Sequence, residues 1–226
     1  MPRNEVKMSF SKYMRFDDIN LTRFNAVLLD LDDTLYQYKT CHEAAILACF
    51  EYHNFGLSLP EFRNLYRSSR TAVTKMLSPQ ASCRSRLFAF QKIVEEANYP
   101  TAYRLAYILD EIYWSRFIDS MVMDLNADAF VERCNINSLP ICIVTDMTAH
   151  IQIRKIQRLG IADKIAYLVT SEEVGVEKPD RRMFDTALSK LGFDAKSCLM
   201  LGDNYTKDVQ GALSVGMTAH LVNLYD

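Results

Sequence analysis

Five short apolar runs constrain the fold of this chain more than any other feature of the sequence. Amphipathic helical patterns over 150–159 and 181–191 lie between the later runs. Short apolar runs that alternate with amphipathic helices are typical of a parallel β-sheet buried on both faces. The sequence therefore predicts an α/β fold. The five predicted strands span residues 24–30, 141–145, 165–169, 198–201 and 218–222.

The first predicted strand is separated from the second by about a hundred residues, far more than a loop usually contains. This stretch shows four or five helical patterns interrupted by Gly and Pro, and no convincing strand. We therefore predict a helical domain over 37–125, inserted into a core formed by 1–36 and 126–226. The four clearest helical patterns of the insert span 42–53, 59–76, 84–97 and 102–117.

The composition is that of an ordinary globular protein, with 49% apolar and 24% charged residues. The formal net charge of -2 gives no electrostatic reason to expect nucleic acid as a partner. No segment approaches the roughly 20 apolar residues of a membrane span, and residues 1–20 lack a signal-peptide pattern. The six cysteines are scattered, which favours free thiols in a reducing compartment. We expect a cytoplasmic protein.

Polar residues follow four of the predicted strands at their carboxyl ends. Asp30 and Asp32 follow the first strand, and alternation in an extended segment places both on one side. Two carboxylates so close repel unless a cation lies between them or they share a proton. Thr145 ends the second strand, Lys178 follows the third and Asp203 follows the fourth. Because ligands of parallel sheets bind at this edge, the residues together predict a functional site.

The segments 30–35, 143–145, 178–179 and 202–208 resemble the motifs of the haloacid dehalogenase-like superfamily of hydrolases. The resemblance covers the predicted core, and the insert is similar to the family's helical cap in size and character. It implies a Rossmann-like three-layer core, a parallel sheet of strand order 5-4-1-2-3 and an inserted α-helical cap.

The resemblance also implies a role for each site residue. Asp30 is the expected nucleophile, which forms an aspartyl-phosphate. Asp32 is expected to protonate the leaving group and then to activate water. Thr145 and Lys178 are expected to hold the phosphoryl oxygens. Mg²⁺ is the expected cofactor, bound by Asp30, the backbone carbonyl of Asp32 and Asp203.

The carboxylate of Asp32 narrows the expected reaction, because dehalogenases of this family lack an acid two residues after the nucleophile. The resemblance implies a Mg²⁺-dependent phosphomonoesterase acting on a small metabolite such as a sugar phosphate or nucleotide. A phosphomutase with the same two aspartates is one alternative. A non-catalytic binding or regulatory protein on this scaffold is another, and the oligomeric state is open.

Three further groups of residues carry weaker expectations. Asp208 is expected to orient Lys178 or a metal-bound water, and Asp146 to point away or to contact a substrate hydroxyl. The aromatic side chains of the insert are expected to form mostly its core. Basic residues of the insert and of the helix over 150–159 are expected at the surface, although the former could also meet a second anionic group of the substrate. These basic residues are Arg63, Arg67, Arg70, Arg84 and Arg86, and Arg154, Lys155 and Arg158.

Overall fold

The computed structural model describes residues 13–224, and a five-stranded parallel sheet lies at its centre. The strand order is β3-β2-β1-β4-β5, which is the predicted order 5-4-1-2-3 read from the opposite edge. The predicted α/β fold is therefore confirmed. The strands are β1 (Ala26–Leu29), β2 (Ile141–Thr145), β3 (Tyr167–Thr170), β4 (Cys198–Gly202) and β5 (Thr218–Leu221).

Alternation along β1 divides its side chains between two hydrophobic clusters, one on each face of the sheet. Val27 and Leu29 join the cluster that includes residues of α5 (Leu125–Ile136) and α6 (Ala149–Arg158). Ala26 and Leu28 join the cluster that includes residues of α8 (Arg181–Leu191) and α9 (Gly211–Ser214). Helices therefore cover both faces, which explains why the central strands contain almost no polar residues.

The remaining core helices are α7 (Ser171–Val174), α8 (Arg181–Leu191) and α9 (Gly211–Ser214). The pattern over 150–159 corresponds to α6 within one residue at each end, and that over 181–191 corresponds to α8. Helix α5 lacks a separate sequence prediction. It begins where the side chain of Asp124 accepts hydrogen bonds from the backbone N–H groups of Asn126 and Ala127.

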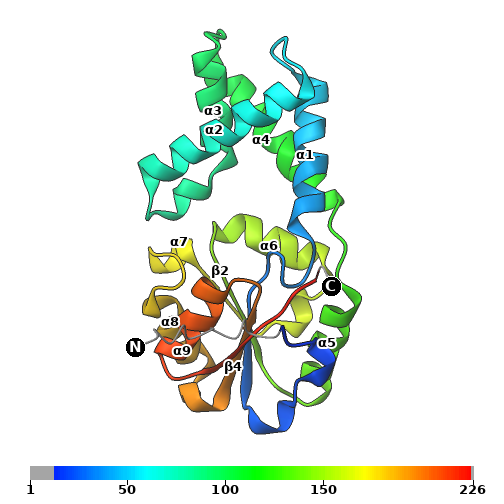
Figure 1. Cartoon of the computed structure of the whole chain (residues 1–226), viewed down its shortest axis with the longest axis vertical. Coiled ribbons are helices and arrows are strands. Elements are labelled where there is room, and N and C mark those ends of the chain that lie inside the picture. The colour runs from blue at the N-terminus through cyan, green and yellow to red at the C-terminus, as the bar shows by residue number, and fades with distance from the viewer. Residues whose placement is uncertain (1–12, 225–226) are drawn as a thin grey trace, which may run out of the picture.

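Four helices of the insert lie together at one end of the molecule, beyond the sheet (Figure 1). Ser58 and Glu61 form a capping box at the start of the second of them. No helix within residues 13–224 has the length and apolar character needed to cross a membrane. The four helices are α1 (Tyr38–Tyr52), α2 (Leu59–Leu77), α3 (Arg86–Glu96) and α4 (Ala102–Asp119).

Several aromatic side chains of the insert form its core, as expected. Tyr66, Phe90 and Tyr113 are buried and lie in ring contact with one another. Others, such as Tyr103 and Tyr107, are exposed. The aromatic cluster therefore mainly stabilises the insert, although Tyr66 also lines the cavity that the insert shares with the sheet edge.

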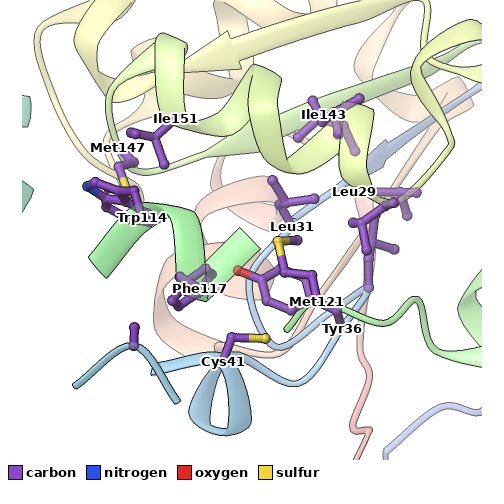
Figure 2. Close-up of a cluster of buried hydrophobic side chains, with 14 of the residues drawn as sticks. Leu29, Leu31, Tyr36, Cys41, Trp114, Phe117, Met121, Ile143, Met147 and Ile151 are labelled. Carbon is purple, nitrogen blue, oxygen red and sulfur yellow. The ribbon is translucent and has the colours of Figure 1, made fainter. Parts of the chain in front are cut away.

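The insert and the core share one hydrophobic junction, shown in Figure 2. Trp114 and Phe117 of α4 lie in this cluster with Leu31, which follows β1, and Ile151 of α6. Tyr36 belongs to the same cluster and is fully buried. The segment that enters the insert is thus packed firmly next to the carboxyl end of β1.

Candidate active site

Asp30 lies directly after β1 and is only 7% exposed. Its Oδ1 accepts a hydrogen bond of 2.6 Å from Nζ of Lys178, and its Oδ2 accepts one of 3.4 Å from the hydroxyl of Thr34. Burial raises the pKa of Asp30, as do Asp208 and Asp203, while Lys178 opposes the shift. Asp30 therefore needs nearby cations to stay in its ionised, carboxylate form.

Lys178 joins three segments of the chain at this edge of the sheet. Its Nζ donates to Asp30, to the carbonyl oxygen of Val144 at 2.8 Å and to Oδ1 of Asp208 at 2.6 Å. Burial lowers the pKa of Lys178, but the two carboxylates outweigh this and raise it. Asp208 thus contacts Lys178, which is one of the two arrangements expected from the sequence.

A π-helical turn over Tyr205–Gln210 holds Asp208 in this position. Oδ2 of Asp208 accepts the backbone N–H of Asn204 at 2.9 Å. Asp208 is 1% exposed, so both of its oxygens are bonded within the protein. We conclude that Asp208 is a fixed partner of Lys178.

Asp30, Asp203 and Asp208 form a carboxylate cluster, with one oxygen of each within 4.8 Å of the others. Burial, and after it repulsion from Asp208 and Asp33, raise the pKa of Asp203 to about 6. Because Asp208 is already bonded to Lys178 and Asn204, Asp30 and Asp203 are the members with lone pairs to offer. Carboxylate oxygens are the ligands that Mg²⁺ prefers, so this cluster suits that ion.

Thr145 ends β2 and faces the same cavity as the aspartates. Its hydroxyl oxygen accepts a hydrogen bond of 2.6 Å from the side-chain amide of Gln152 in α6. Both residues are almost completely buried. With the oxygen engaged as an acceptor, the hydroxyl proton of Thr145 is left to donate, as a phosphate oxygen requires.

The cation that pairs with Asp32 is Lys155, a residue expected at the surface from the sequence. Nζ of Lys155 donates to Oδ1 of Asp32 at 2.7 Å and to Oδ2 at 3.0 Å, and the hydroxyl of Tyr36 also donates to Oδ1. Burial raises the pKa of Asp32, but these two partners outweigh it, so the pKa lies below its usual value. Lys155 is 0% exposed, so the expectation that it lies at the surface is wrong.

The position of Lys155 in α6 carried a signal of its burial. Lys155 lies four residues after Ile151 and four before Leu159, on the apolar stripe of the helix. Its Nζ also lies 5.3 to 5.9 Å from the ring centroids of four aromatic residues. A lysine on a buried stripe needs a carboxylate, and Asp32 supplies it. Arg158 of the same helix is exposed, as expected.

Asp146 is neutralised by the protein itself. Its Oδ2 accepts a 2.5 Å bond from Nζ of Lys207, and its Oδ1 accepts the backbone N–H of Lys178 at 2.9 Å. The carboxylate thus positions the Lys178 backbone, and its charge is balanced beside the predicted phosphate site.

A cavity of about 600 Å³ contains all the predicted site residues. The side of the cavity opposite the sheet is formed by the insert. Five arginines of the insert line the cavity there: Arg63, Arg67, Arg70, Arg84 and Arg86. Arg86 is 6% exposed, so the expectation of a solvated helix face is wrong for this residue. Arg84 reaches the core, where its Nε and Nη2 each donate to Glu177 at 2.6 Å. The carboxyl edge of the sheet and the insert therefore line one shared cavity.

The model of a known family, described as haloacid dehalogenase-like hydrolase, matches residues 24–216. A relative from Halopiger xanaduensis, ribulose-1,5-bisphosphate 5-phosphatase, is 32% identical over 85% of this chain and 82% of its own. A glyceraldehyde 3-phosphate phosphatase from Methanothermobacter thermautotrophicus is 43% identical over 32% of each chain.

Among solved structures, the chain resembles the HAD-hydrolase YfnB of Bacillus subtilis, whose crystal structure is bound to magnesium. The TM-score is 0.68 at 19% identity, and 88% of each chain is covered. At this level of identity the likeness concerns the fold alone.

Proposed function

Because this chain belongs to the haloacid dehalogenase-like hydrolases, we propose that it hydrolyses phosphate monoesters of small metabolites, with Asp30 as the nucleophile. The observation that carries this proposal is the buried bond between Asp30 and Lys178 at the carboxyl edge of the sheet. Lys178 leaves the second oxygen of Asp30 with only the long bond from Thr34. That oxygen is available to attack phosphorus.

The proposed reaction has two steps. First, a carboxylate oxygen of Asp30 bonds to phosphorus and the ester P–O bond breaks. Asp32 takes up a proton from solvent before this step, because Lys155 favours its carboxylate form, and gives that proton to the leaving oxygen. Then Asp32 takes a proton from water, whose oxygen bonds to phosphorus and releases inorganic phosphate from Asp30. Lys155 favours the carboxylate form of Asp32, which suits the second step, so we assign it a positioning role.

Lys178 and Thr145 are proposed to hold the phosphoryl oxygens. Lys178 does so by its charge, because its three N–H groups already donate within the protein. Lys178 offsets negative charge on both Asp30 and the transferred group, and Thr145 donates its free hydroxyl proton. Asp208 keeps Lys178 in place through its 2.6 Å ion pair. Positive charge and hydrogen-bond donors fixed in advance stabilise the charge that develops in the transition state.

Mg²⁺ is the proposed cofactor, held by Asp30, Asp203 and the backbone carbonyl of Asp32. The pair of carboxylates with lone pairs to offer supports this assignment. The ion would supply positive charge to the phosphoryl oxygens.

We further propose that residues 37–125 act as a cap that excludes water and selects the substrate, above a core of residues 1–36 and 126–226. The ion pair between Arg84 of the insert and Glu177 of the core supports closure over the cavity. The relatives named as phosphatases of ribulose bisphosphate and glyceraldehyde 3-phosphate support a small phosphorylated metabolite as substrate.

The test measures inorganic phosphate released from a panel of small phosphate esters, with Mg²⁺ and with a chelator. The wild type should release phosphate only with Mg²⁺, and Asp30→Asn should release none. Asp163→Asn, an exposed site, is the matched control and should match the wild type. A folded wild type that binds Mg²⁺ but hydrolyses no ester would contradict the proposal.

A further inference from the structure

The cavity above the catalytic edge carries more positive charge on its cap side than one phosphoryl group requires. Lys178 already serves the phosphoryl site at the sheet edge. The cap contributes five more cations to the same wall, although the whole chain has a net charge of -2. These cap arginines are Arg63, Arg67, Arg70, Arg84 and Arg86.

Two of the five arginines are neutralised within the protein. Arg84 forms its two-bonded ion pair with Glu177. Arg63 pairs with Glu43 through a 2.7 Å contact. Both charges are therefore balanced before any ligand binds.

Arg70 and Arg86 are bonded only to uncharged groups. Nη1 of Arg70 donates to the carbonyl oxygens of Cys83 and Ser85 at 3.1 and 3.2 Å. Arg86 donates to the carbonyl oxygen of Arg84 at 2.6 Å and to the hydroxyl of Tyr38. No carboxylate within residues 13–224 forms an ion pair with either one. Two buried or half-buried cations side by side without an anion are costly.

Further polar atoms on this wall lack partners. Nε of Arg86 and the hydroxyl of Tyr66 are buried and have no hydrogen-bond partner in the part of the chain that the structure describes. Burial and the nearby charge of Arg86 lower the pKa of Arg70 to about 10. Buried polar atoms are nearly always bonded, so these point to a ligand.

We propose that Arg70 and Arg86, together with Tyr66, bind a second anionic group of the substrate, either a phosphate or a carboxylate. The inference rests on the proposed phosphatase activity and narrows its substrate to an ester with negative charge at both ends. Guanidinium groups suit both anions because their N–H groups match paired oxygens. A cavity of about 600 Å³ is large enough for a small metabolite that spans both sites.

The test compares three esters with the same carbon skeleton: a bisphosphate, a phosphorylated carboxylic acid and a monophosphate. The wild type should show the highest kcat/KM for one of the two doubly anionic esters, and the preferred one identifies the second group. Arg70→Gln should lower kcat/KM for that ester, relative to the monophosphate, by about 10- to 100-fold, the effect of one lost charge-assisted bond.

Arg104→Gln, an exposed site on α4, is the matched control and should leave the ratio unchanged. Because Arg86 is buried, its variants could unfold, so Tyr66→Phe serves as the second probe of the same wall and should also reduce the preference. Equal kcat/KM for all three esters, or an unchanged ratio in Arg70→Gln, would overturn the inference.

Binding separates this inference from the proposed function. Calorimetry on Asp30→Asn with the bisphosphate and the monophosphate measures anion recognition without turnover. Tighter binding of the bisphosphate, reduced by Arg70→Gln, supports the second site even when no ester is hydrolysed. If all esters are hydrolysed and the bisphosphate and monophosphate bind equally well, the phosphatase proposal stands and the second anion site is contradicted.

Discussion

Nζ of Lys155 lies 2.7 Å from Oδ1 of Asp32, although Lys155 belongs to α6 and Asp32 to the loop after β1. Asp32 is the proposed acid and base, and Tyr36 is its other hydrogen-bond donor. We predict that Lys155→Met lowers kcat at least about 10-fold and the free energy of unfolding by about 2 kcal/mol, because a largely buried carboxylate loses its cation.

Phosphate release and thermal unfolding check this prediction, with Arg154→Met on the same helix as the control. A Lys155→Met protein with the kcat of the wild type would show that Asp32 needs no cation to hold its position.

Gly202 ends β4 beside the carboxylate cluster of Asp30, Asp203 and Asp208, and a side chain there has no space. A Cβ atom added at Gly202 would lie 2.3 Å from Oδ2 of Asp208. We predict that Gly202→Ala displaces Asp208 from Lys178, lowers kcat at least about 10-fold and reduces stability by about 1 to 3 kcal/mol.

Measurements of kcat and of the unfolding midpoint test this prediction. Ser214→Ala, in the short helix α9 on the same side of the sheet, is a control that should retain activity. Full activity in Gly202→Ala would mean that the contact of Asp208 with Lys178 is dispensable.

Glu177 ties the core to the insert, and its contribution to stability depends on pH. Burial raises the pKa of Glu177, but Arg84 and Lys207 outweigh this and lower it from 4.5 to about 2. The unfolded state therefore binds more protons between these values, so stabilisation is complete above pH 4.5 and is lost as the pH falls towards 2. The groups that face this carboxylate are Cys83, Arg84 and Lys207.

We predict that Glu177→Gln is less stable than the wild type by about 2 kcal/mol at pH 7. The difference should shrink between pH 5 and about pH 3, as denaturant unfolding at several pH values will measure. Glu51→Gln, an exposed site in α1, should show no such trend. A difference that is constant over this range would contradict the linkage.

We predict that Mg²⁺ binding stabilises the folded protein, an effect that can be measured without any catalytic activity. The cluster of Asp30, Asp203 and Asp208 holds like charges within 4.8 Å, and a bound cation relieves their repulsion. At ten times its dissociation constant the ion adds about 1.4 kcal/mol, which raises Tm by a few degrees.

The measurement is thermal unfolding with Mg²⁺ and with a chelator. Asp203→Asn should lose the Mg²⁺-dependent increase, whereas Asp163→Asn should keep it. An equal increase in Asp203→Asn would place the ion elsewhere.

The sheet and the convergence of the main site residues were predictable because both follow from local patterns. Apolar runs mark strands that are buried on both faces, and the carboxyl ends of parallel strands meet at one edge. Asp30, Thr145 and Asp203 each stand at such an end, and Lys178 follows β3 after the short helix α7, so the order of the elements along the chain brought them together. The resemblance to the family supplied the strand order and the expected chemistry.

The partners of these residues were not predictable in the same way. Lys155 was expected at the surface because a charged residue in an amphipathic helix usually is. Its pairing with Asp32 depends on how α6 packs against the sheet and against the aromatic rings of the insert. The spacing of Lys155 from Ile151 and Leu159 indicates a buried position in α6. The sequence does not show which carboxylate, on another element, would pair with it.

By itself the sequence determined the α/β core, the helical insert and the edge at which the acidic residues gather, since these depend on the periodicity of each segment. The tertiary structure alone decided which charges are balanced. Arg84 meets Glu177 and Lys155 meets Asp32 across long stretches of chain, while Arg70 and Arg86 meet no acid among residues 13–224. Charge pairing acts over a few ångströms in space, and a linear pattern does not record those distances.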